Sequence, residues 1–251
     1  SSAAAIRIQE IMDIPALHIS NVHKRIEATD IVFENVDFRY NEKDNYALKN
    51  INFEVKANTV TALVGPSGAG KSTVAKLIPR FWDVTSGSIK IGGVDIKDVD
   101  SQTLMDTVSF VFQDTFLFND TLANNIKMAS PTATDEEMVQ ACKAAQIHEF
   151  ILSLPEAYET MAGDRGTNLS GGQKQRITIA RAILRNTPIV VLDEATAFAD
   201  PENEEEIIKA LANLMKNKTV IVIAHRLSTI KDVDQIVVFD NGEVKEKGKH
   251  Q

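Results

Sequence analysis

The chain has 251 residues, of which 43% are hydrophobic, so it can fill the core of one large α/β domain or two small ones. Its formal net charge is −8 and no block of Lys and Arg stands out, which argues against a broad surface for nucleic acid. The longest uninterrupted apolar run, residues 220–224, is far shorter than the roughly 20 residues that a membrane-spanning helix needs.

The first third of the chain predicts a β-subdomain. Ile8, Ile11 and Met12 share one helical face before Pro15, which predicts a short helix at the start. Residues 31–40 and 47–55 then alternate apolar and polar side chains, which is typical of antiparallel strands with one solvated face.

From residue 58 onward, short apolar runs alternate with helical stretches, which predicts a mainly parallel sheet covered by helices. The expected strands are residues 59–65, 188–194, 219–225 and 235–244, and no terminal element is expected after them.

Between these runs, residues 114–185 predict a mostly helical insert. Thr134 and Glu137 form a capping box for a helix through about Ala145. Cys142 falls in that helix, where packing is its expected role, and a single cysteine excludes an internal disulfide and fits a reducing compartment.

The segment GPSGAGKST, residues 65–73, fits the phosphate-binding pattern GxxxxGK[ST] between an expected strand and an expected helix over residues 71–81. A chance match in a chain of this length has odds of roughly one in a hundred before that context is counted. The glycines let backbone N–H groups and the helix dipole face phosphate oxygens. Lys71 would neutralise the β and γ oxygens, Ser72 would bind Mg²⁺, and Thr73 would reach the α-phosphate.

Two carboxylates, Asp193 and Glu194, end the apolar run 189–192, at the carboxyl edge where ligands bind in α/β sheets. Asp193 suits Mg²⁺, and Glu194 suits orientation or deprotonation of the attacking water. His225 ends another strand in the same way; alone it is more often structural, but beside this site we predict that it contacts the γ-phosphate. The alternative for the carboxylates is a solvated strand end.

A second glycine-containing segment, LSGGQKQR at residues 169–176, poses a problem, because one chain has no need of two phosphate loops for one nucleotide. Ser170 and Gln173 form a capping box for a helix over residues 174–184. Taken alone, the segment is best interpreted as an ordinary helix cap.

The chain resembles the nucleotide-binding domain of an ABC transporter over about residues 28–248. The resemblance rests on six motifs in this order: GPSGAGKS, the glutamine of FVFQD, LSGGQ, IVVLDE, ATAFAD and IAHR. The resemblance implies an α/β P-loop NTPase core of mainly parallel sheet flanked by helices, an N-terminal antiparallel β-subdomain and an inserted α-helical subdomain. It implies residues 28–251 as the ATP-binding domain, with 28–113 and 186–251 as core plus β-subdomain and 114–185 as the helical subdomain.

In this family two domains pair head to tail, and each ATP lies between the Walker A loop of one and LSGGQ of the other. The helix after LSGGQ would then point at the partner's γ-phosphate. The implied catalytic residues are Lys71, Gln113, Glu194 and His225, and the implied Mg²⁺ ligands are Ser72, Gln113 and Asp193. The implied ATP-binding residues are Tyr40 (stacked on adenine), Gly65, Pro66, Ser67, Gly68, Ala69, Gly70, Lys71, Ser72, Thr73, Ser170, Gly171, Gly172, Gln173 and Asp200 (on the D-loop at the dimer interface).

Further segments resemble the exporter branch: residues 7–15, 80–96, 116–126 and the AGDRG loop at 162–166. Residues 1–27 would follow the last transmembrane helix of a membrane domain that precedes residue 1. The expected partners are therefore ATP, a second identical or different ATPase domain, and that membrane domain, at the cytoplasmic face of the cell membrane. The excised domain itself is expected to be soluble.

Three residues depart from the exporter pattern: Asp164 replaces a usual glutamate, Trp82 a common tyrosine, and Ala199 a Leu or Val. The first affects the expected contact with the membrane domain, and none touches the phosphate chemistry.

The alternative function is a soluble ABC ATPase acting on nucleic acid or protein partners. The DNA-repair type needs a long coiled-coil insertion and the translation type needs two cassettes, and neither is present. A P-loop kinase or GTPase switch leaves LSGGQ unexplained.

Overall fold

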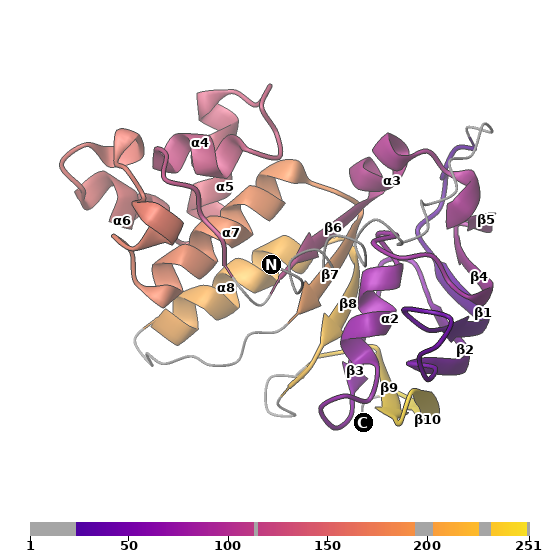
Figure 1. Ribbon diagram of the computed structural model, residues 1–251. Coiled ribbons are helices and arrows are strands. Elements are labelled where there is room, and N and C mark those ends of the chain that lie inside the picture. The colour runs from indigo at the N-terminus through magenta and orange to yellow at the C-terminus, as the bar shows by residue number, and fades with distance from the viewer. Residues whose placement is uncertain (1–23, 113–114, 194–202, 226–231, 250–251) are drawn as a thin grey trace, which may run out of the picture.

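Two β-sheets and a group of helices make up the computed structural model, which describes residues 24–112, 115–193, 203–225 and 232–249. In Figure 1 the parallel sheet occupies the centre, the antiparallel strands lie to its right and most helices lie to its left. The predicted α/β fold class is confirmed. None of the helices in the described ranges has the length and apolar character needed to cross a bilayer.

The antiparallel sheet has the strand order β2-β1-β4-β5. Its first two strands are those predicted from alternating side chains, and Phe33 of β1 stacks on Phe53 of β2 with ring centroids 4.5 Å apart. The strand patterns did not predict β4, which pairs with the other edge of β1, or β5, which pairs with β4. The bounds are β1 Ile31–Phe38, β2 Leu48–Val55, β4 Ser86–Ile91 and β5 Val94–Asp95.

The second sheet has the order β10-β9-β3-β8-β7-β6, and all its pairings are parallel except that of β9 with β10. The mainly parallel sheet is therefore confirmed, although β6 was not predicted as a strand. The bounds are β3 Val60–Val64, β6 Val108–Val111, β7 Ile189–Asp193, β8 Thr219–Ile223, β9 Gln235–Asp240 and β10 Glu243–Gly248.

The prediction of one buried strand over residues 235–244 is wrong, because this segment turns back on itself. β9 ends at Asp240, and Asn241 and Gly242 follow with φ of 50° and 75°, as a tight hairpin turn with two left-handed residues requires. The returning strand β10 is mostly exposed. It also supplies the terminal element that the sequence patterns did not predict.

Side chains of the parallel sheet divide between its two faces. Val190 and Leu192 of β7 pack with α7 (Gly171–Arg185) and α8 (Glu204–Met215), whereas Ile189 and Val191 pack with α2 (Lys71–Leu77) and the antiparallel sheet. Because both faces are covered, the strands are continuous apolar runs. Helices α2 and α7 therefore cover opposite faces of one sheet.

The described part of residues 114–185 is mainly helical, as predicted, and α5 begins with the predicted capping box between Thr134 and Glu137. Cys142 lies in α5 and is fully buried, which confirms its packing role. The other bounds are α4 Leu122–Lys127, α5 Asp135–Ala144, α6 His148–Ser153, η2 Ala157–Glu159 and η3 Asp164–Gly166.

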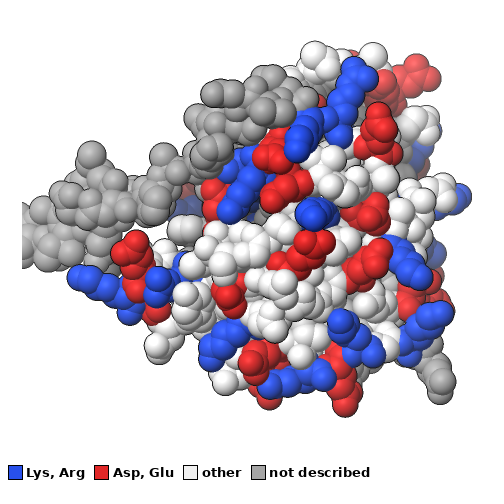
Figure 2. Space-filling model, turned by 90° about the vertical axis from the view of Figure 1, so that its right-hand side faces the viewer, with Lys and Arg blue, Asp and Glu red and all other residues white. Residues whose placement is uncertain are grey.

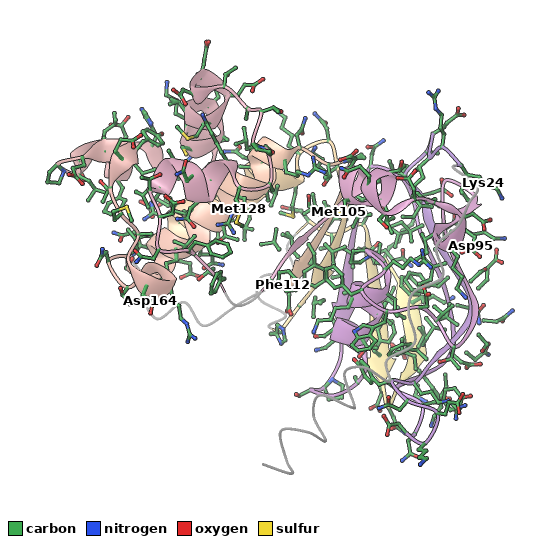
Figure 3. All side chains as sticks on the ribbon, turned by 45° about the horizontal axis from the view of Figure 1, so that its top comes forward. Lys24, Asp95, Met105, Phe112, Met128 and Asp164 are labelled. Carbon is green, nitrogen blue, oxygen red and sulfur yellow. The ribbon has the colours of Figure 1, made fainter. Side chains whose placement is uncertain are left out.

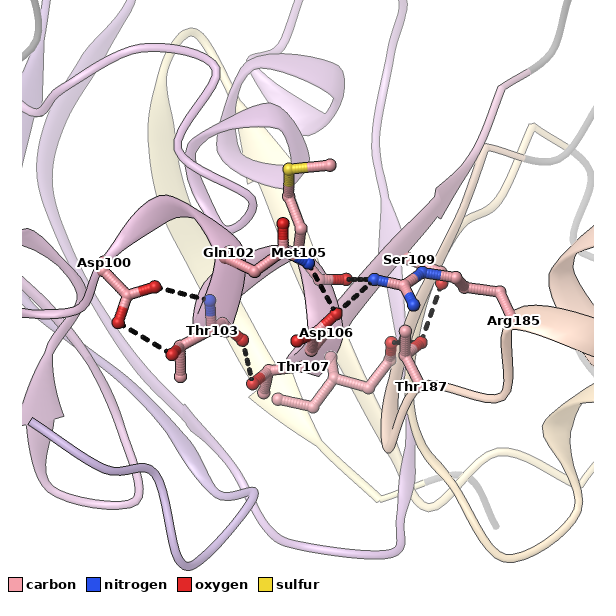
Figure 4. Close-up of polar contacts among 10 residues, drawn as sticks. Asp100, Gln102, Thr103, Met105, Asp106, Thr107, Ser109, Arg185 and Thr187 are labelled. Atoms are coloured by element: carbon pink, nitrogen blue, oxygen red, sulfur yellow. Dashed lines mark hydrogen bonds and ion pairs between the residues drawn. The ribbon is translucent and has the colours of Figure 1, made fainter. Parts of the chain in front are cut away.

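The carboxyl end of α7 is anchored to α3 (Ser101–Thr107), which follows η1 (Ile96–Asp98). Figure 4 shows Arg185 between the two elements: its guanidinium donates to the Asp106 carboxylate, at 2.5 Å, and to the Met105 carbonyl, at 3.2 Å. Thr187 then donates to the Ser109 hydroxyl at 2.8 Å. These contacts fix where α7 joins the sheet.

Candidate functional site

The loop between β3 and α2 has a backbone that only glycine can form at two of its positions. Gly65 has φ of 145°, and a Cβ there would lie 2.0 Å from the Phe239 carbonyl oxygen of β9. Gly70 has φ of 106° and lies against the Leu48 side chain. Residues 66–68 are exposed, so the loop is open to solvent at its tip.

Lys71 begins α2 and folds back across this loop. It is only 6% exposed, and its Nζ donates to the Gly65 carbonyl oxygen at 2.5 Å. Burial lowers the pKa of Lys71, and the negative charge of Asp193 opposes that effect. A buried cation at the start of a helix and beside a glycine-containing loop suits a phosphate group, whose charge would offset the cost of burial.

The helix that follows is shorter than the predicted 71–81, because α2 ends at Leu77. Pro79 has no N–H to donate to the Ala75 carbonyl, and Arg80 then takes a left-handed φ of 61°, so the helix does not continue. Ser72 and Thr73 lie in its first turn and are half-buried.

Tyr40 lies just after β1 and meets the phosphate loop's helix. Its hydroxyl is 3.2 Å from the Thr73 hydroxyl, and its ring meets Phe38 and Trp82 edge-on, with centroids 4.8 and 5.2 Å apart. The ring stays 42% exposed. An aromatic ring that is held by neighbouring rings and exposed to solvent is suited to stack on a planar base. Trp82, which the sequence comparison marked only as a departure from the exporter pattern, is one of the rings that hold Tyr40.

Asp193 and His225 come together at the carboxyl edge of the parallel sheet. Asp193 ends β7 and lies opposite Ile223 of β8, two residues before His225. His225 Nε2 and Asp193 Oδ1 are 3.0 Å apart. Lys71, Asp193 and His225 therefore lie around one edge, as ligand-binding residues of α/β sheets do.

Ser170 caps α7 as predicted. Gln173 N–H donates to Ser170 Oγ at 3.2 Å, and Ser170 N–H donates to Gln173 Oε1 at 2.9 Å. Ser170 and Gly171 are exposed, and a Cβ built on Gly171 meets nothing within 4 Å. The first turn of α7 thus has free space next to Gly171.

The two glycine-containing segments do not meet. Residues 65–73 lie at α2 and residues 169–173 at α7, which cover opposite faces of the sheet (Figure 1). Among the described residues, no hydrogen bond or ion pair joins the two segments. Lys71 and Ser170 of one chain therefore belong to helices on opposite faces of the sheet.

Three predicted site residues, Gln113, Glu194 and Asp200, lie outside the described residues. Of the expected Mg²⁺ ligands, the structure describes Ser72 and Asp193, a hydroxyl and a carboxylate, which are oxygen donors of the type Mg²⁺ prefers.

Comparisons with known proteins all find ABC transporter proteins. A family model described as "ABC transporter" matches residues 48–197. The chain is 50% identical over 220 residues to the putative multidrug export ATP-binding/permease protein YgaD of Bacillus subtilis, covering 88% of this chain and 38% of that protein. It is 46% identical over 257 residues to an ATP-dependent lipid A-core flippase of Syntrophus aciditrophicus, covering 99% and 42%.

Among solved structures, a bacterial Atm1-family ABC exporter with ATP bound matches with a TM-score of 0.88 and 40% identity, over 98% of this chain and 43% of that chain. The chain thus spans about two fifths of the length of the proteins that it matches.

Proposed function

Because this chain belongs to the ABC transporter family, we propose that it is the ATPase part of a longer exporter. ABC ATPase domains bind ATP. In the proposal, two such domains pair head to tail, hydrolyse Mg-ATP, and thereby drive export by an attached transmembrane domain. The observation that carries the proposal is that the Lys71 loop and the Ser170 loop lie on opposite faces of one sheet. A two-fold axis between two copies would bring them together at two sites.

Within one site, the Tyr40 ring would hold adenine and the backbone of residues 65–73 would hold the phosphates. Lys71 would neutralise the β and γ oxygens, which is where its buried charge gains most. Mg²⁺ supplies charge neutralisation when bound, and Ser72, Gln113 and Asp193 would hold it. Glu194 would orient the attacking water.

His225 would contact the γ-phosphate while its ring is held by Asp193. The partner domain would complete the site with Ser170, Gly171, Gly172 and Gln173, and Asp200 would cross the interface.

The membrane partner would dock on two pairs of exposed aromatic side chains. Phe81 and Phe112 stack with centroids 5.9 Å apart, and Phe116 and Phe118 meet edge-on at 4.8 Å; all four rings are exposed. In Figure 3, Met128 and Asp164 lie on the helical part, Met105 lies on α3, and Phe112 lies between the two. Exposed aromatic pairs on a chain that spans two fifths of its relatives suit contact with a further domain.

We propose the same division of the chain as the sequence predicts: a linker over residues 1–27, then the ATPase domain with its helical subdomain over 114–185. The first five residues carry no structural role in this proposal. The proposed dimer contains a second ATPase domain that is either identical to this chain or different from it.

The relatives are named as export proteins and flippases, which does not favour a soluble ABC ATPase acting on nucleic acid. On the face shown in Figure 2, Lys and Arg are interspersed with Asp and Glu rather than gathered in one basic patch. Such a mixed surface gives a nucleic-acid backbone little to bind.

Glu194→Gln tests the proposed reaction. We expect ATP to bind as in the parent, hydrolysis to slow by a factor of about 100 or more because the general base is lost, and the ATP-bound dimer to accumulate. Turnover and a sizing column with Mg-ATP measure both effects.

Glu54→Gln, at an exposed glutamate of β2, is the matched control and should behave like the parent. If Glu194→Gln hydrolyses ATP at the parental rate and remains monomeric with Mg-ATP, the proposed role of Glu194 is wrong.

A further inference from the structure

Arg176 is a buried cation whose contacts surround the first turn of α7. It is 6% exposed, and its guanidinium donates to three elements. Nη1 donates to the Gln146 carbonyl at 2.6 Å, Nη2 to the Asn203 amide oxygen at 3.0 Å, and Nε to the Gly172 carbonyl at 3.4 Å. Arg176 ends the segment LSGGQKQR, in which the resemblance assigns roles only to residues 170–173.

The three acceptors lie on separate parts of the chain. Gln146 lies in the turn between α5 and α6, Gly172 in the first turn of α7, and Asn203 immediately before α8. A planar guanidinium can donate in three directions at once from fixed positions, whereas an ammonium on a flexible stem cannot hold the same geometry. Arg176 therefore fixes these segments relative to one another.

Gly172 is pressed directly against Asn203. A Cβ built on Gly172 would lie 3.0 Å from Asn203 Cβ and 3.2 Å from its side-chain carbonyl carbon. The distance between the glycine turn and the start of α8 thus depends on how the Asn203 side chain is held. Arg176 Nη2 is a donor to that side chain.

Because the Arg176 guanidinium is buried, its N–H groups need hydrogen-bond acceptors within the protein. Removal from water lowers the pKa of Arg176, and the nearby negative charge of Glu206 opposes that effect. A buried guanidinium retains its charge only where acceptors satisfy its N–H groups, and here the acceptors are the groups that shape the turn.

We propose that Arg176 is a positioning residue for the segment 170–173: it sets the place from which Ser170 and Gly171 reach the partner domain's ATP, by locking Gly172 and Asn203 together. This inference rests on the proposed function, in which that segment acts on the partner. Arg176 does not contact the nucleotide in this account, because it is buried behind the turn.

Arg176→Lys keeps the charge and removes the planar fork. We expect the unfolding midpoint to fall, because buried hydrogen bonds are lost, while binding of a fluorescent ATP analogue to the monomer, measured well below that midpoint, stays near the parental value. We expect ATP-driven dimerisation, measured in the Glu194→Gln background, to weaken about tenfold and maximal turnover of the single variant to fall about tenfold, because the lost contact positions the turn that meets a partner.

Asn203→Ala removes one acceptor of Arg176 without substituting a residue of α7. Like Arg176→Lys, it should lower dimerisation and turnover. If both act through one contact, the double variant should lose less than the sum of the two single losses. Arg185→Lys is the matched control on the same helix, since Arg185 contacts α3 at the other end, and it should dimerise like the parent.

Parental dimerisation and turnover in Arg176→Lys would overturn the proposal, as would strictly additive losses in the double variant. If Arg176→Lys unfolds or loses ATP binding as a monomer, Asn203→Ala decides: parental behaviour there would overturn the proposal. A parent that does not dimerise with ATP would instead overturn the proposed function, and this inference with it.

Discussion

At the scale of single residues, Lys71 combines features that a phosphate site needs. It is buried, its Nζ already contacts a backbone carbonyl of the loop, and Asp193 is its opposing charge. An entering phosphate would add negative charge close to Nζ, so the cost of burying this cation falls when the ligand binds.

Lys71→Ala should therefore weaken ATP binding by about 10- to 150-fold, the equivalent of about 1.5–3 kcal/mol for one charge-assisted contact. It should also abolish turnover. Nucleotide titration of the purified domain measures the first effect and phosphate release the second. Lys76→Ala, on the same helix and half-exposed, should bind ATP as the parent does. Equal affinities for both variants would show that residues 65–73 do not hold the phosphates.

At the scale of elements, α5 and α7 begin with the same reciprocal cap. In each, the side chain before the helix accepts from the third residue, and that residue's side chain accepts in return. In α7 the cap lies in the segment that we propose meets a partner's ATP. A substitution there would therefore change both the stability of the helix and the proposed contact with ATP. In α5 the cap faces solvent and can be measured alone.

Thr134→Ala should destabilise the start of α5 by about 1 kcal/mol, because the Glu137 N–H loses its acceptor. Amide hydrogen exchange should then be about fivefold faster in the first turns of α5. Thr132→Ala, at an exposed threonine two residues earlier, should leave this exchange unchanged. Protection equal to the parent's in Thr134→Ala would mean that the cap contributes nothing in this protein.

At the scale of the whole molecule, the sheet separates the two segments that we propose as half-sites. The phosphate loop lies at the end of β3 toward α2, and the glycine turn of α7 lies on the helices of the other face. In the proposed function each chain contributes two different half-sites, and a symmetric dimer would combine the four into two complete sites.

Mixing two inactive variants tests this arrangement. Lys71→Ala lacks one half and Ser170→Arg lacks the other, so each homodimer should be inactive. In a mixed dimer, one site combines the intact Lys71 loop of one chain with the intact Ser170 turn of the other. An equal mixture should recover about a quarter of the parental turnover if the sites act independently, since half of the dimers are mixed and each has one complete site.

Crosslinking first establishes that the mixed dimers form. Mixed dimers that bind ATP without hydrolysing it, alongside a Ser170→Arg protein that retains activity alone, would contradict the shared site. The concentration must be high enough to populate dimers.

The sequence by itself determined the features that depend on local spacing. The pattern GxxxxGK[ST] between a strand and a helix, the apolar runs of β3, β7 and β8, and both capping boxes follow from neighbouring residues, and the structure has them where they were predicted. Local patterns did not separate β9 from β10, although Asn241 and Gly242 carried the turn signal.

Only the tertiary structure decided which distant groups meet. Asp193 and His225 are 32 positions apart and come within 3.0 Å because β7 and β8 are neighbours, an order that apolar runs do not encode. The hairpin turn at Gly242 donates to the Ala69 carbonyl at 2.9 Å and so supports the phosphate loop from the far end of the chain. The same holds for Arg176 and Asn203: a buried guanidinium takes its acceptors from whatever the packing brings near, and packing is a property of the whole fold.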